Sequence, residues 1–219
     1  MNVGELVMSL TVIRYSVETG RRIISREELE ELFKGDNVSK KIKILCTKGV
    51  LKPIIRGRLY YVVDYNERKL GITAPKLKLF AEALNRSGVK WYLTGMSALS
   101  LRGVTWEHPR EIWIFNDRFR HRVKNSFIGI PVHFFKPPRK LLHFGIEEKG
   151  ELKIASVEKA VLDYLYVSLP PTISNPREWT GIVLGLIKPC NKEKLLEYLK
   201  YYPSNVKEVV KAAINRSYT

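Results

Sequence analysis

Residues 24–63 read ISREELEELFKGDNVSKKIKILCTKGVLKPIIRGRLYYVV, and this stretch decides the expected fold of the first part of the chain. Ser25 is followed three residues later by Glu28, which is the pattern of a capping box, so a helix is predicted to start after Ser25. The Gly35-Asp36-Asn37 segment predicts a turn after that helix, because glycine and asparagine tolerate positive φ angles.

A second helix is predicted from Val38 or Ser39 to Lys48, with Gly49 as its stop. At 100° per residue, its apolar side chains gather on one face: Val38, Ile42, Leu45 and Cys46. The opposite face carries Lys40, Lys43, Ile44 and Thr47, with Lys41 and Lys48 on the flank. Four lysines without an acid are unusual for a solvated helix, which normally mixes charge signs.

Two β-rich runs follow, residues 50–55 and 59–63, joined by a tight turn at Arg56-Gly57-Arg58. Pro53 suits an edge strand, because proline lacks the N–H that a central strand needs. The order helix, turn, helix and hairpin predicts a winged helix-turn-helix, which is a DNA-binding arrangement. A plain basic helix and an ordinary surface turn are the alternatives that this pattern leaves open.

In the winged-helix interpretation, the lysines lie near phosphates, whereas Ile44 and Thr47 offer apolar contacts to thymine methyl groups. Arginines at a hairpin tip suit the minor groove or the backbone. The residues predicted to contact DNA are Ser39, Lys40, Lys41, Lys43, Ile44, Thr47, Lys48, Arg56 and Arg58.

The strongest signal in the composition is positive charge. The 219 residues include 38 lysines and arginines against 22 acids, which gives a formal net charge of +16 and favours polyanionic partners. Both parts of the chain contribute, with 12 basic and 7 acidic residues in 1–63 and 26 basic and 15 acidic residues in 64–219. The sequence predicts neither a signal peptide nor a membrane span, so a cytoplasmic location is expected. Two cysteines and four scattered histidines predict no disulfide framework, metal site or cofactor.

The polar segment 64–74 is expected to separate two domains, residues 1–64 and residues 75–219. The second domain is expected to be a mixed α/β domain with a small sheet and a helical C-terminus, so the predicted fold class is α+β. The expected strands are 90–94, 111–115, 130–135, 141–144 and 151–154. The expected helices include 157–167, 178–187, 192–201 and 206–214.

Two segments of the second domain carry a family resemblance. Residues 92–104 read YLTGMSALSLRGV and residues 150–164 read GELKIASVEKAVLDY. With the N-terminal pattern, they resemble the AbiEi antitoxin family over about residues 24–164. This resemblance implies a transcriptional repressor that binds inverted repeats in its own promoter. It also implies the antitoxin of a type IV pair, whose nucleotidyltransferase-like toxin need not form a stable complex with it. A dimer on the DNA is left open.

An enzyme is the main alternative. Gly95-Met96-Ser97 after a strand resembles nucleotidyltransferases, which need two carboxylates two residues apart to hold two Mg²⁺ ions. Here Trp113 stands two residues after Glu111, and Asp117 is six residues away. We therefore expect no catalysis and no catalytic residue. An RNA-binding protein is a further alternative, since the basic second domain would suit RNA equally.

Three further polar residues are expected to have no special chemical role. Glu158 and Lys159 are expected to cap and solvate the start of their helix. His133 is expected to be exposed on its strand.

Overall fold

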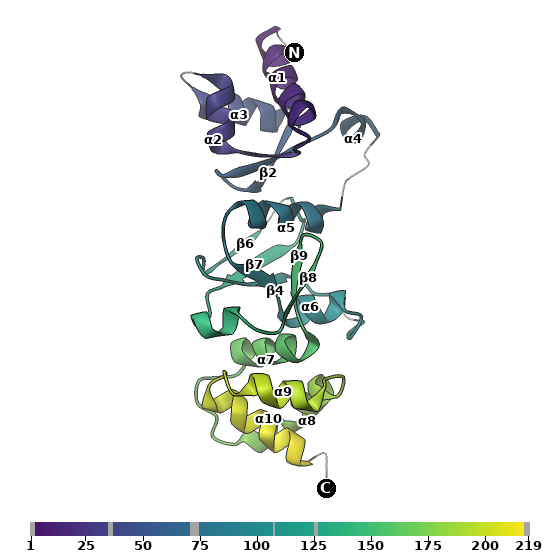
Figure 1. Ribbon diagram of the computed structural model, residues 1–219, viewed down its shortest axis with the longest axis vertical. Coiled ribbons are helices and arrows are strands. Elements are labelled where there is room, and N and C mark those ends of the chain that lie inside the picture. Colours follow the sequence, from purple (N-terminus) through teal and green to yellow (C-terminus); the bar gives the residue numbers. More distant parts are fainter. Residues whose placement is uncertain (1–2, 35–36, 71–74, 107, 125–126, 217–219) are drawn as a thin grey trace. The chain divides into compact units, whose positions relative to one another are not determined.

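The computed structural model describes residues 3–34, 37–70, 75–106, 108–124 and 127–216. It divides the chain into two compact units, residues 1–88 with 125–129 and residues 89–124 with 130–219. Each unit combines helices with a β-sheet, so the chain has a mixed α/β fold (Figure 1).

The first unit places its helices beside a three-stranded antiparallel sheet of order β1-β3-β2. β2 is an edge strand, as Pro53 predicted, and a register shift lies between Pro53 and Ile55. The elements are α1 (Val3–Thr19), β1 (Ile23–Ser25), α2 (Arg26–Phe33), α3 (Val38–Thr47), β2 (Leu51–Ile55), β3 (Leu59–Val62), α4 (Tyr65–Leu70) and α5 (Lys76–Arg86).

One apolar core joins the three N-terminal helices to this sheet. It consists of Val12, Ile24, Leu29, Ile42, Leu45, Val50, Leu51, Tyr60 and Val62. The predicted capping box of α2 is confirmed: the Glu28 N–H donates to Ser25 Oγ at 3.1 Å, and the Ser25 N–H donates to Glu28 Oε2 at 2.6 Å. The predicted inner face of α3 is also confirmed, since Ile42 and Leu45 are buried.

The first unit extends further along the chain than the predicted domain limits of 1–64 and 75–219. Helix α5 belongs to it, because Arg86 lies 3.1 Å from Glu28 and also donates to the Ile23 carbonyl. Part of the expected linker is helix α4, which is held by an ion pair of 2.7 Å between Arg22 and Glu67. Residues 71–74 of that linker lie outside the described residues.

The second unit contains a six-stranded mixed sheet of order β6-β7-β5-β4-β9-β8. The pairs β4–β9 and β5–β7 are parallel, and the other three pairs are antiparallel. The strands are β4 (Trp91–Leu93), β5 (Ile112–Asn116), β6 (His121–Lys124), β7 (Pro131–Phe135), β8 (Ile146–Lys149) and β9 (Leu152–Ala155). The predicted strand at 141–144 is wrong: Arg139–Leu142 form a 3-10 turn, and the strand begins at Ile146. Pro137-Pro138 favours this turn because a proline fixes its own φ near −65°.

Helix α7 (Val157–Ser168) forms the middle layer of the second unit and contacts α6 (Gly95–Leu101), β9 and the three C-terminal helices (Figure 1). Those helices are α8 (Thr180–Ile187), α9 (Lys192–Leu199) and α10 (Ser204–Arg216), preceded by a short 3-10 turn at Pro176–Trp179. The predicted helical C-terminus is therefore confirmed.

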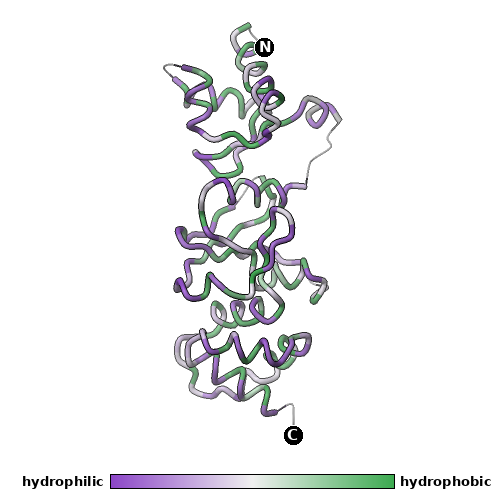
Figure 2. The backbone as a smooth tube through the Cα atoms, viewed as in Figure 1, coloured by the Kyte–Doolittle hydropathy of each residue, from purple (hydrophilic) through white to green (hydrophobic). Residues whose placement is uncertain are grey.

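Hydrophobic segments follow the strands and the helices between them, and they also recur along α1 (Figure 2). None of the helices within the described residues is long and apolar enough to cross a bilayer.

Candidate nucleic-acid interface

Helix α2 ends and helix α3 begins at residues with a left-handed backbone, and Gly35 and Asp36 of the predicted turn lie outside the described residues. Lys34 ends α2 in the left-handed region with φ of 31°, and Asn37 precedes α3 with φ of 69°. Asparagine tolerates such a φ better than most residues, which explains its place before α3. Because Ile42 and Leu45 are buried against the core, the opposite face of α3 is turned to solvent.

Three predicted contact residues lie exposed on that outer face: Lys40, Lys43 and Thr47. Ile44 is half-buried between them, and the ten residues of α3 include no acid. The Thr47 hydroxyl donates back to the Lys43 carbonyl at 3.0 Å, so the methyl group is the part of this side chain without a hydrogen bond in the helix. The outer face of α3 therefore presents positive charge with small apolar patches.

Lys41 and Lys48 lie to the side of this face and make contacts within the first unit. Lys41 Nζ lies 3.4 Å from the Phe33 carbonyl and 5.4 Å from the centre of its ring. Lys48 Nζ lies 3.4 Å from Glu5 Oε2. The structure thus gives these two lysines a role in holding α3 to α2 and α1.

Ser39 is linked to a basic residue that the sequence pattern did not single out. Its hydroxyl accepts a hydrogen bond of 3.0 Å from the guanidinium of Arg26, which also lies 2.8 Å from Glu30. Arg26 thus adds a cation at the first turn of α3. Only its four-residue spacing from Glu30 was visible in the sequence, and such spacing marks an ordinary helical pair.

The turn between β2 and β3 carries the remaining predicted residues, Arg56 and Arg58, and both are exposed. Gly57 between them has φ of +76°, a region that favours glycine. The Arg58 carbonyl accepts a hydrogen bond of 2.8 Å from the Arg26 N–H, where α2 begins. The backbone therefore joins the β2–β3 turn directly to the helix pair.

The second unit has a basic edge of its own. Strand β6 lies at the end of the sheet and, with the residues before it, exposes five basic side chains: Arg118, Arg120, His121, Arg122 and Lys124. An edge strand with cations also resists pairing with another sheet. This strand accounts for part of the positive charge expected in the second domain.

Glu111 is enclosed by neighbours. Its Oε1 accepts a hydrogen bond of 2.7 Å from Trp113 Nε1, and its Oε2 lies 2.7 Å from Arg122. The expectation that His133 is simply exposed is wrong, because its side chain is half-buried. Its ring stacks on that of Phe135 with 3.8 Å between the ring centres, and its Nδ1 lies 3.8 Å from Glu111 Oε1. Burial lowers the pKa of His133 and outweighs the raising effect of Glu111. Among the described residues, no group of three His, Cys, Asp or Glu side chains is arranged to hold a metal ion.

The prediction that Glu158 and Lys159 are solvated is wrong. Lys159 is fully buried, 3.4 Å from Asp163 and 4.2 Å above the Phe144 ring. The Glu158 carboxylate accepts a hydrogen bond of 2.9 Å from the Asn191 N–H. Both residues are buried because α7 is a middle layer, packed on more than one side.

Asp163 is the centre of a buried polar network. Its carboxylate accepts hydrogen bonds from Tyr92 at 3.0 Å, from Thr94 at 2.6 Å and from Tyr202. Burial raises the pKa of Asp163 against the opposing charge of Lys159 and these hydrogen bonds. This network joins β4, α7 and the end of α9, and its groups are enclosed, so its role is to hold the second unit together.

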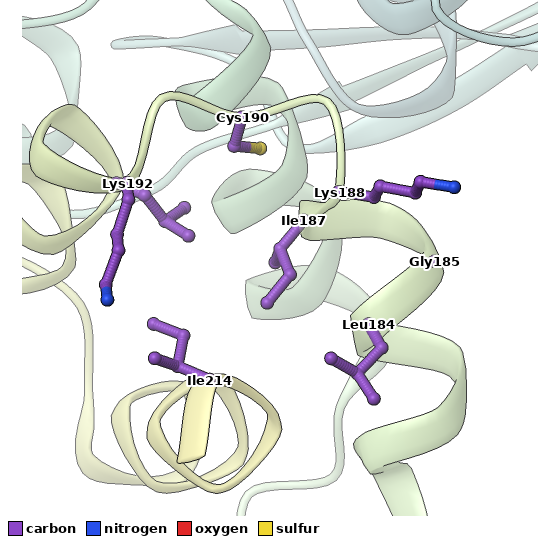
Figure 3. A pocket seen from close by; sticks show the side chains of 8 residues that line it. Leu184, Gly185, Ile187, Lys188, Cys190, Lys192 and Ile214 are labelled. Carbon is purple, nitrogen blue, oxygen red and sulfur yellow. The ribbon is translucent and has the colours of Figure 1, made fainter. Parts of the chain in front are cut away.

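An apolar pocket of about 440 Å³ lies among α8, α9 and α10, lined by Leu184, Gly185, Ile187, Lys188, Cys190, Lys192, Leu195 and Ile214. Ile187 and Ile214 face each other across it, and Lys188 points away (Figure 3). Burial raises the pKa of the Cys190 thiol to about 12, so the thiol stays protonated at neutral pH. The pocket is suited to apolar groups and not to thiolate chemistry.

No protein-family model and no curated protein matches the chain. Among solved structures, the chain is similar to the crystal structure of the RV2827C protein from Mycobacterium tuberculosis, with a TM-score of 0.55 and 14% sequence identity. The match covers 94% of this chain and 77% of that chain. At this identity the likeness concerns the fold alone, and it spans nearly the whole mixed α/β arrangement.

Proposed function

We propose that the first unit is a winged helix-turn-helix and that the protein is a sequence-specific DNA-binding repressor. The observation that carries this proposal is the outer face of α3. It exposes Lys40, Lys43 and Thr47 on a helix without acids. In this proposal α3 enters the major groove and the β2–β3 turn is the wing.

The contacts divide by chemistry. Lys40, Lys43 and the two arginines of the β2–β3 turn neutralise phosphates and position the protein. Ile44 and the Thr47 methyl group lie between the lysines and suit thymine methyl groups. Sequence preference therefore rests on the two smaller side chains, whereas most of the affinity comes from the cations.

The wider role follows from the resemblance to AbiEi antitoxins. We propose that the protein represses its own operon in the cytoplasm and is the antitoxin of a type IV pair, without catalytic activity of its own. Its partner would be a nucleotidyltransferase-like toxin, whose neutralisation need not involve a stable complex. A growth assay tests this part: the neighbouring gene should encode a nucleotidyltransferase that arrests growth, and co-expression of the chain should restore growth. An arrest that co-expression leaves unchanged contradicts the antitoxin role.

Binding to the upstream DNA tests the DNA-binding part. Fluorescence anisotropy should show tighter binding to the chain's own upstream sequence than to a shuffled duplex. Replacing Lys40 and Lys43 by alanine should weaken binding by roughly tenfold or more at moderate salt. The slope of log affinity against log salt should become shallower by about 2, because each lysine neutralises about one phosphate.

Lys192→Ala with Lys194→Ala is the matched control, since it removes the same charge from exposed positions on α9. This pair should change binding far less than the α3 pair. Equal losses would remove α3 from its proposed role, and equal binding to shuffled DNA would contradict a specific repressor.

RNA binding is the alternative that one observation favours, namely the exposed basic edge at β6. Competition between the upstream duplex and a structured RNA separates the two functions. In the proposed function the duplex displaces RNA. If RNA displaces the duplex instead, and if Arg120→Ala with Arg122→Ala weakens binding more than the α3 pair, RNA is the ligand.

A further inference from the structure

Helix α1 carries a stripe of exposed apolar side chains. Val3, Leu6, Val7, Leu10 and Val17 are exposed by 79, 43, 56, 55 and 75%. The opposite face of α1 is buried through Ser9 and Val12, with Val12 in the apolar core. A surface helix normally turns its polar side chains outward, so this exposed face is the reverse of a solvated one.

The stripe has the geometry of a helix–helix contact. At 100° per residue, its members and Arg14 cover about 100° of the helix surface, opposite the buried face. Positions 3, 7, 10, 14 and 17 alternate spacings of four and three, as in the contact seam of a coiled coil. The positive charge of Arg14 within the stripe is paired with an acid, because its Nε lies 2.6 Å from Glu18 Oε1. The aliphatic stem of Arg14 can lie along the apolar surface.

We propose that this α1 stripe is the contact surface between two copies of the chain, packed antiparallel about a twofold axis beside Leu10. Leu10 is the midpoint between Val3 and Val17. Reversing one helix against the other therefore sets Val3 of one copy near Val17 of the second. A twofold contact requires such self-complementarity, since the same patch serves both copies.

The charge distribution favours a second copy at this place. The chain carries a formal net charge of +16, so two copies repel each other overall. Helix α1 differs, because its 17 residues include Arg14 against the two acids Glu5 and Glu18. Two copies can approach along α1 without setting cation against cation. The same balance makes α1 unsuited to a polyanion.

The contact is small. One helix on each side provides less than the roughly 800 Å² per partner of a standard protein interface. The pairing is therefore a monomer–dimer equilibrium and not an obligate dimer. The dimer is expected to form without DNA. A DNA site with two half-sites would favour it further, because it would hold two copies close together.

Sedimentation equilibrium of the full chain without DNA tests this inference. The wild-type chain should dimerise between about 1 and 100 μM. Leu10→Lys should weaken dimerisation by at least tenfold, because it sets two ammonium groups against each other at the axis. Ile182→Lys is the matched control: Ile182 is 61% exposed on α8, and this variant should dimerise like the wild type. Circular-dichroism melting should show that both variants keep the wild-type fold.

Disulfide trapping tests the orientation. In a chain with Cys46→Ser and Cys190→Ser, Val3→Cys and Val17→Cys are made separately and mixed. Antiparallel packing predicts crosslinks between the Val3→Cys chain and the Val17→Cys chain. Crosslinks mainly within each variant would overturn the antiparallel contact.

Three further results would overturn the proposal. The first is a chain that stays monomeric up to about 100 μM. The second is a dimer that Leu10→Lys leaves unchanged, which would use another surface. The third is a monomeric chain whose melting temperature falls in the Leu10→Lys variant. That result would show that another part of the same chain covers α1. A monomer that still binds its upstream DNA would overturn this inference alone and leave the proposed function standing.

Discussion

Helices α3 and α7 both carry lysines, but they place them in opposite environments. Lys40 and Lys43 on α3 are exposed, whereas Lys159 on α7 is fully buried beside Asp163. The difference comes from what surrounds each helix. α3 packs on one side, and α7 is packed between the sheet and three helices. A lysine on a helix thus indicates a surface only where packing leaves its side of the helix free.

Asp163→Ala is the variant that should change the environment of the buried lysine most. The variant leaves Lys159 buried without its anion and removes the acceptor of Tyr92, Thr94 and Tyr202. We expect the free energy of unfolding to fall by about 3–5 kcal/mol, the usual cost of removing one partner of a buried pair. Urea unfolding measures this loss.

Lys159→Met with Asp163→Asn is the companion variant. It removes both charges and nearly keeps the volume, and the Asn amide oxygen can still accept from the hydroxyls, so it should recover at least half of the loss. A loss below about 1 kcal/mol for Asp163→Ala would show that the pair is not the buried network described.

Glu28 is an intermediate case, a carboxylate that is partly enclosed. Burial raises its pKa, but the Ser25 N–H and Arg86 outweigh burial, so the net pKa is lowered from 4.5. A lowered pKa means that the folded state favours the charged form. The stabilisation is therefore present above about pH 4.5 and is lost as the pH falls through the lowered pKa.

Glu28→Gln should lower the free energy of unfolding at neutral pH by about 1–2 kcal/mol, because it weakens hydrogen bonds to a charged group. It should also flatten the acid limb of stability against pH, followed by urea unfolding between pH 3 and pH 7. Glu30→Gln serves as the control, since its pair with Arg26 is exposed and worth about 0.5 kcal/mol. An acid limb as steep as in the wild type would contradict the assignment to Glu28.

The smallest expected change in stability is at the exposed lysines. Lys40→Ala and Lys43→Ala should each change the free energy of unfolding by less than about 0.5 kcal/mol, as surface substitutions usually do. The same variants should nonetheless weaken DNA binding, as proposed above. A large loss of stability would mean that these lysines hold α3 in place, and the binding data would then need another explanation.

Sequence reasoning succeeded in the first unit where the pattern was local. The capping box at Ser25 and Glu28 and the two faces of α3 depend on spacings of three and four residues within one helix. Such spacings are visible without knowledge of the rest of the chain. The exposed positions of Lys40, Lys43 and Thr47 follow from the same periodicity.

Sequence reasoning failed where distant segments decide the environment. Lys159 and Asp163 look like an ordinary pair at i and i+4, and their burial depends on Tyr92 and Tyr202, far away in the sequence. The domain boundary was misplaced for the same reason, because Arg86 returns to Glu28 across 58 residues. Strand β1 has only three residues, too few to show an alternating pattern.

The hydrogen bond between the Arg58 carbonyl and the Arg26 N–H has a consequence for how this surface can evolve. It fixes the spacing between the β2–β3 turn and α2 through peptide groups alone. Side chains at positions 56 and 58 can therefore be exchanged without disturbing the frame that presents them. Successive substitutions there can change the charge of the turn while the scaffold stays the same.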